Sequence, residues 1–147
     1  MKKILLILGL MFLITGCGDK VIEEPGDDLL DKIYAGYTDE IVLGRTVIDS
    51  ENVEYYLGTS DIEFEEAVAS EPMMTSIAHS VVLLKVKDGA NKQDIMTKIK
   101  NNVNPNKWIC VGVDPSNVRV HENGNLILLV MTDEKPDLLV DNFMKLK

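Results

Sequence analysis

Two stretches of the chain, VVLLKVKD (81–88) and LILLVMTD (126–133), restrict the fold more than any other feature. The first is apolar at every position from Val81 to Leu84, and the second is apolar from Leu126 to Met131. Successive side chains of a strand point to opposite faces of its sheet. A strand that is apolar at consecutive positions must therefore be covered on both faces, so we expect these two stretches to lie inside the domain.

The two stretches also match each other, and each is followed by a helical pattern. Leu83, Leu84 and Asp88 of the first correspond to Leu128, Leu129 and Asp133 of the second. The helices that follow match after a one-residue gap, with Ile95, Met96 and Ile99 falling on Leu139, Val140 and Phe143. The match is weak in identity, so two similar units that arose by convergence remain an alternative to a true internal repeat.

These units predict an α+β domain in which a strand–strand–helix unit occurs twice (ββαββα). We expect an antiparallel sheet with the helices mainly on one face and an N-terminal helical segment, from Asp27, partly covering the other. Asn123-Gly124 between two apolar runs favours a type I′ hairpin turn that pairs Val120 with Ile127. Asn91 is placed to cap the helix that follows the first stretch.

The N-terminus has the layout of an export signal. MKK is a basic segment, and an apolar run of 12 residues extends from Ile4 to Thr15. A membrane-spanning helix needs about 20 residues, so this run is too short to span. It ends in Ile14-Thr15-Gly16-Cys17, which resembles the lipobox of bacterial lipoprotein precursors: an aliphatic residue, two small residues and a cysteine. The alternative is an ordinary secretory signal with an incidental cysteine.

The lipobox resemblance implies that Cys17 receives the acyl chains and becomes the first residue of the mature protein. Two or more acyl chains hold a protein stably on a bilayer, whereas one does so only marginally. We therefore expect a signal peptide at residues 1–16, a lipidated cysteine and polar tether at 17–26, and one α+β domain at 27–147. The predicted location is the cell membrane, with the protein lipid-anchored on its extracytoplasmic face.

The charge balance excludes one large class of partner. The formal net charge is −9, and the two lysines Lys2 and Lys3 precede Cys17, so the chain from Cys17 onward carries −11. A nucleic-acid-binding protein needs a basic face, which this composition argues against. The same balance argues against attachment to anionic lipid heads by charge.

A longer resemblance covers roughly Asp27 to the C-terminus. Its marks are the EPMM turn, the HSVVLLKVKD strand, the KWICV segment and the hairpin at Gly124. With these the chain resembles a family of domains of unknown function found in surface lipoproteins of Gram-positive bacteria. The resemblance implies an exported, lipid-anchored small domain, and it supplies no catalytic residues.

The chain offers no motif for a catalytic site, a cofactor or a metal ion. His79 and Ser80 are neighbours, but adjacent side chains of a strand point apart, so His79 cannot activate Ser80. There is no zinc-type or EF-hand spacing. Asp61, Glu63, Glu65 and Glu66 form an acidic cluster that we interpret as a solvated strand face, with a weak calcium site as the alternative.

We expect a contact surface instead, formed by Met73, Met74, Tyr55, Tyr56 and Trp108. Methionines exposed together make an adaptable contact surface. Core packing is the alternative for each of these residues, and Cys110 in the apolar segment KWICVGV is expected to be a buried free thiol. The sequence therefore favours a non-enzymatic binding module with an envelope protein as partner. An envelope hydrolase that uses an unidentified pair of acids is the alternative, and a structural spacer is a third.

Overall fold

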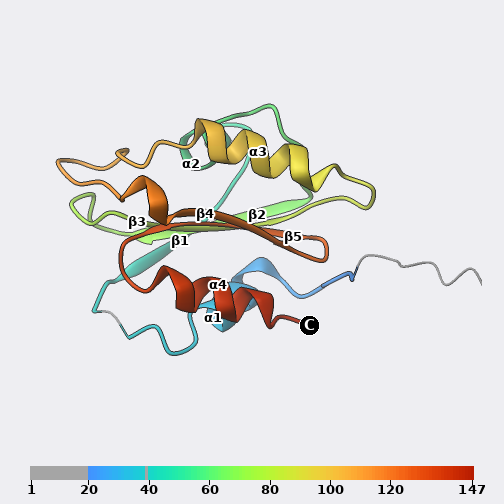
Figure 1. Ribbon diagram of the computed structural model, residues 1–147, viewed down its shortest axis with the longest axis horizontal. Helices are drawn as coiled ribbons and strands as arrows, with labels where there is room; N and C mark the ends of the chain where they lie inside the picture. The colour runs from blue at the N-terminus through green and yellow to red at the C-terminus, as the bar shows by residue number, and fades with distance from the viewer. Residues whose placement is uncertain (1–19, 39) are drawn as a thin grey trace, which may run out of the picture.

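A five-stranded antiparallel sheet forms the centre of the computed structural model, which describes residues 20–38 and 40–147 (Figure 1). Cys17 and the expected signal peptide at 1–16 lie outside the described residues. The strand order is β1-β2-β3-β5-β4. The strands are β1 Leu43–Val47, β2 Glu66–Pro72, β3 His79–Lys85, β4 Val118–Asn123 and β5 Leu126–Thr132. The prediction of an α+β domain built on an antiparallel sheet is confirmed.

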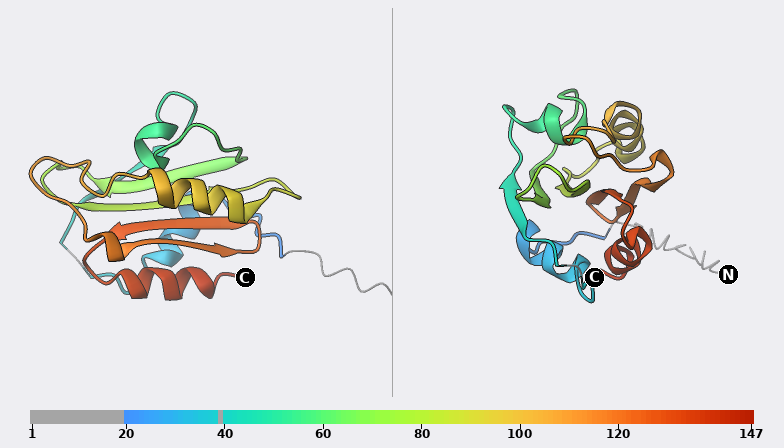
Figure 2. Two further views of the ribbon diagram at one scale, coloured as in Figure 1. Left: turned by 45° about the horizontal axis from the view of Figure 1, so that its top comes forward. Right: turned by 90° about the vertical axis from the view of Figure 1, so that its left-hand side faces the viewer.

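Helices cover both faces of this sheet, as the end-on view in Figure 2 shows. The first face packs on α2 Val53–Leu57 and α3 Lys92–Asn102, and we call it the α3 face. The second packs on α1 Gly26–Ile33 and α4 Pro136–Met144, and we call it the α4 face. Every residue of β5 is buried because its side chains enter both cores. The apolar strands are thus covered on both faces of the sheet, as expected.

The expectation that the helices lie mainly on one face is wrong. Leu83 and Leu128, which correspond in the two units, both point to the α4 face, and Leu84 and Leu129 both point to the α3 face. Nevertheless, α3 packs on one face of the sheet and α4 packs on the opposite face. A rotation that exchanges the antiparallel neighbours β3 and β5 would keep both helices on the same face of the sheet. The helices lie on opposite faces, so the two units have opposite hand and no rotation superposes one on the other. The weak sequence match is therefore not a structural repeat of ββα units.

The β4–β5 hairpin differs from its predicted register by two residues. Val120 pairs with Leu129 instead of Ile127, and the turn consists of Gly124 and Asn125. Gly124 has a φ of 61°, whereas Asn125 is not among the residues of positive φ. A type II′ turn has glycine at its first central position, and a type I′ turn would need positive φ at both. A register shift of two residues leaves each side chain on the face of the sheet that was predicted for it, so the predicted core residues of the hairpin are unchanged.

The two ends of the sheet have different surroundings. At one end lie the β4–β5 turn, the C-terminal end of α4 and Lys20, and we call this the entry end (Figure 1). At the other end lie the 73–78 loop between β2 and β3 and the 103–114 loop after α3, and we call this the loop end. No helix within the described residues is long and apolar enough to cross a membrane.

The segment expected to be a free tether is partly docked. From Lys20 onward the chain lies against the entry end, and Ile22 is 2% exposed within the core of the α4 face. Glu24 and Lys32 of α1 form an ion pair at the surface. Residues 20–26, the part of the expected tether that the structure describes, therefore belong to the folded domain.

Candidate functional site

Exposed apolar side chains gather at the loop end. They come from the residue before β1, from α2 and from the two loops, and we call this group the loop-end patch: Val42, Tyr55, Met73, Met74, Ile109 and Val111. Met73 is 76% exposed and Ile109 is 65% exposed. Exposed apolar groups that occur together, rather than singly, indicate a contact surface.

Backbone hydrogen bonds hold the parts of the patch together. The Ile109 N–H donates to the Thr75 carbonyl across 3.0 Å, which ties the 103–114 loop to the 73–78 loop. The Met73 N–H donates to the Val42 carbonyl across 3.1 Å, which continues the β1–β2 pairing beyond the strands. The patch is thus built on loops that are fastened to the sheet, and such loops commonly carry binding sites.

A buried lysine lies beneath the patch. The Lys107 side chain is only 6% exposed, and its ammonium forms an ion pair with the Glu71 carboxylate of β2. Its Nζ lies 4.3 Å from the ring centre of Tyr55, 5.0 Å from that of Tyr56 and 5.3 Å from that of Trp108. A cation over an aromatic face is attracted by the ring quadrupole, and the attraction grows as water is removed. Lys107 therefore joins α2, β2 and the 103–114 loop.

Burial and the ion pair act on this lysine in opposite directions. Removal of the ammonium from water lowers the pKa of Lys107, and the Glu71 carboxylate only partly restores it. The nearby Glu71 carboxylate also adds to the effect of burial in raising the pKa of Tyr55. Burial is the largest cause of both pKa shifts, and the Glu71 carboxylate acts on each group.

Glycine at the end of α2 allows the tyrosines to reach this position. Gly58 ends the helix with a φ of 73°, which is the left-handed conformation that glycine adopts without cost. A Cβ at Gly58 would lie 2.3 Å from the carbonyl carbon of Asn102 at the end of α3. The close approach of the two helix ends thus requires glycine, and it sets α2, with Tyr55 and Tyr56, over the sheet.

The five residues of the predicted contact surface do meet at the loop end, although they differ in exposure. Tyr55, Met73 and Met74 are exposed, Tyr56 is half-buried, and Trp108 is 8% exposed within the core of the α3 face. No sequence pattern pointed to Lys107 and Glu71, because a lone lysine ordinarily lies in solvent. Ile109 and Val111 had a detectable signal, since they are apolar residues outside any expected strand.

Cys110 is exposed and has a φ of 60°, so the expectation of a buried thiol is wrong. The loop turns back at this residue and directs Ile109 and Val111 outward as well. The hollow beside Trp108 is lined by Asn106, Cys110 and Val111 and not by either tyrosine. The loop end therefore presents an open surface, which suits a macromolecular contact better than an enclosed small ligand.

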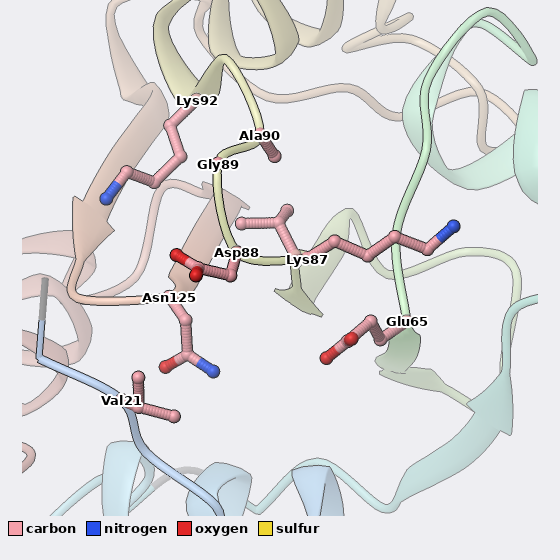
Figure 3. A pocket seen from close by; sticks show the side chains of 9 residues that line it. Val21, Glu65, Lys87, Asp88, Gly89, Ala90, Lys92 and Asn125 are labelled. Carbon is pink, nitrogen blue, oxygen red and sulfur yellow. The ribbon is translucent and has the colours of Figure 1, made fainter.

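A small pocket of about 190 Å³ lies at the entry end (Figure 3). Glu65 and Asp88 bring two negative charges to it, and Lys87 and Lys92 bring two positive charges. Lys92 donates to the Gly124 carbonyl across 2.8 Å, and Figure 3 shows the Lys87 side chain extending away from Asp88. This balanced set of charges does not select a class of ligand.

The acidic cluster is divided among separate lysines. Asp61 pairs with Lys98, and Glu63 pairs with Lys87. Glu66 accepts hydrogen bonds from Lys85 and from the Gly26 N–H. No group of three or more histidine, cysteine, aspartate or glutamate side chains within the described ranges is arranged to hold a metal ion.

His79 has a structural environment in the α4-face core. Its Nε2 lies 2.7 Å from the Tyr34 hydroxyl and its Nδ1 lies 3.4 Å from the Tyr37 hydroxyl. Burial raises the pKa of the Tyr34 hydroxyl well above its usual value. Ser80 is paired with Met131 and points to the opposite face, so the neighbouring histidine and serine do not form a catalytic pair, as predicted.

Comparison of the chain with protein-family models, with curated proteins and with solved structures finds no match. The roles of the two ends of the domain are therefore inferred from their geometry and from the sequence.

Proposed function

We propose that the protein is a lipid-anchored module on the extracytoplasmic face of the cell membrane and that it binds an envelope protein through the loop-end patch. The observation that carries the proposal is the gathering of exposed apolar side chains at the end of the sheet opposite to Lys20. An anchor at Cys17 attaches the domain by its entry end, so the patch remains accessible to a partner.

The composition of the patch supports a protein partner. Tyrosine and methionine are enriched in the cores of protein interfaces, and methionine adapts its shape to different surfaces. Lys107 and the rings around it hold Tyr55 in place before a partner arrives, which lowers the entropy lost on binding. The lipobox-like sequence that ends at Cys17 agrees with an envelope setting.

The test replaces two patch residues at once. The double variant Met73→Ser, Ile109→Ser is expected to reduce recovery of the partner about tenfold or more in a crosslinking pull-down from intact membranes, because central apolar anchors carry most of the binding energy. Both side chains are exposed, so the fold should be unaffected.

Met144→Ser is the matched control, since Met144 is 52% exposed and lies on α4 away from the loop end. This variant should recover the partner as the natural protein does. Equal recovery by all three proteins would refute the proposal that the loop-end patch is the contact surface. Turnover of a substrate that disappears when two acids are mutated would favour the alternative, an envelope hydrolase.

A further inference from the structure

The first described residues of the chain are clamped to the β4–β5 turn. The Lys20 carbonyl accepts a hydrogen bond from the Asn125 N–H across 3.0 Å, and the Ile22 N–H donates to the Asn125 side-chain oxygen across 2.8 Å. The Asn125 side-chain amide also donates to the Ile22 carbonyl. The Lys20 ammonium donates to the Leu146 carbonyl, which ties the same segment to the end of α4.

Close packing reinforces this clamp. Gly124 has a φ of 61°, and a Cβ there would lie 2.1 Å from the Lys20 carbonyl oxygen. The chain therefore crosses directly over the turn, in a path that a side chain at position 124 would block. Ile22 is buried, whereas Val21 is 63% exposed and lines the pocket of Figure 3 beside Asn125. The segment leaves the domain at one fixed point.

The distance from this point to Cys17 is short. Three residue steps separate Cys17 from Lys20, and an extended chain spans at most about 3.6 Å per residue, or roughly 11 Å. An acylated Cys17 lies at the bilayer surface, so Lys20 can be no further than this from the lipid. The segment is too short for the domain to turn freely above the membrane.

We propose that the entry end of the domain lies directly against the lipid headgroups and that the loop end points away from the membrane. This inference rests on the proposed lipidation of Cys17 and goes beyond it, because a lipid anchor alone does not fix an orientation. The entry end carries the exposed lysines Lys20, Lys145 and Lys147 as well as the pocket acids Glu65 and Asp88, so the short segment after Cys17, and not charge, sets the orientation. The acyl chains supply the attachment and hold the domain at the membrane against the repulsion between its net charge of −11 and anionic headgroups.

The same geometry sets the height of the binding surface. β3 and β5 each have seven residues, so they separate the two ends of the sheet by about 20 Å at roughly 3.3 Å per residue. With the strands upright on the membrane, the loop-end patch is presented about this far above the headgroups. In this orientation a partner binds the patch at a distance from the bilayer, and a protein embedded in the headgroup layer would not reach it.

The experiment measures the distance of two spin labels from the lipid surface. The lipidated protein is placed in vesicles of phosphatidylglycerol and phosphatidylcholine that carry a nickel-chelating lipid. One label is attached to the natural Cys110 at the loop end, and the other to Lys145→Cys in a Cys110→Ser background. We expect relaxation enhancement by nickel to be several-fold larger at position 145 than at Cys110. Equal enhancement, or a larger effect at Cys110, would overturn the proposed orientation.

Two further variants and a control keep the test decisive. An insertion of about 20 Gly and Ser residues after Asp19 should abolish the difference between the labels, because a flexible chain of this length lets the domain turn. Gly124→Ala should reduce the difference by displacing Lys20. Gly89→Ala is the control and should not reduce it, because Gly89 also has positive φ but a Cβ there would meet no atom within 4 Å.

Failure of the anchor and failure of the orientation give different results. If the full-length protein isolated from the cell membranes does not float with the vesicles, the proposed lipidation of Cys17 is refuted. If it floats but the two labels respond equally, lipidation stands and the orientation is refuted.

Discussion

Cys17→Ala is expected to abolish the incorporation of labelled palmitate completely. The Cys17 thiol is the proposed attachment point for the acyl chains, and alanine offers no nucleophile in its place. The apolar run before Cys17 has 12 residues, which suits a signal peptide that is removed and not a membrane span. Cells that grow with the labelled fatty acid provide the measurement, after electrophoresis of the immunoprecipitated protein.

The second cysteine provides the control for this prediction. Cys110 is exposed at the loop end, so Cys110→Ser should keep its label at the level of the natural protein. A labelled Cys17→Ala protein, or loss of the label in Cys110→Ser, would show that the lipid is not carried by Cys17.

Glu71→Ala is expected to lower the free energy of unfolding by about 3–5 kcal/mol, because it leaves the buried Lys107 ammonium without its carboxylate. Guanidinium denaturation can follow this through the fluorescence of Trp108, the single tryptophan, which lies beside Lys107. The double variant Glu71→Leu, Lys107→Met removes both charges and keeps similar volumes, so it should recover most of the lost stability. A double variant as unstable as Glu71→Ala would show that the loss comes from packing.

The pH dependence adds an independent readout. Burial holds the pKa of Lys107 in the folded protein below its unfolded value of 10.5. Between these two values the unfolded state binds more protons, so this group makes stability rise with pH in that window. Without the Glu71 carboxylate, the pKa of Lys107 in the folded protein falls further. The pH range in which stability rises with pH then extends to lower pH. The deficit of Glu71→Ala should therefore shrink as the pH rises toward 10.5, and a constant deficit would contradict a charged Lys107.

The helix cap at Asn91 could be predicted because its signal is local. Asn91 caps α3 as expected, with its side chain accepting from the Asp94 N–H. Gly58 ends α2 in the left-handed conformation that glycine favours at this position. The hairpin register was two residues off because Asn123-Gly124 and Gly124-Asn125 both provide turn residues, and the choice depends on pairing along the whole strand.

The placement of the helices was wrong for a non-local reason. A similar order of elements in the two units suggested a similar arrangement, but the hand of each unit depends on which core its helix fills. β5 is buried along its whole length, so helices on one face alone would leave its other face exposed. The unbroken apolar run from Leu126 to Met131 already indicated that both faces of this strand must be covered. The apparent repeat of the two units favoured helices on one face instead.

Three members of the loop-end patch were predicted from the sequence, but Val42, Ile109, Val111 and the charged centre beneath them were not. Met73, Met74 and Tyr55 have the exposure that a contact surface requires. Lys107 and Glu71 are 36 positions apart, so their meeting depends on the path of the 103–114 loop and not on a local pattern. The hydrogen bond between the Asn125 N–H and the Lys20 carbonyl is equally non-local. It fixes the chain at Lys20, within the segment that was expected to be a tether.

Site-specific photocrosslinking in intact cells tests most directly the claim that the loop-end patch binds an envelope protein. A photoreactive amino acid at Ile109 is compared with one at Val47, which is 67% exposed on the edge strand β1. We expect one discrete protein adduct from position 109, lost when Met73→Ser is added, and no such adduct from position 47. No protein adduct at position 109, or the same adducts from both positions, would contradict the claim.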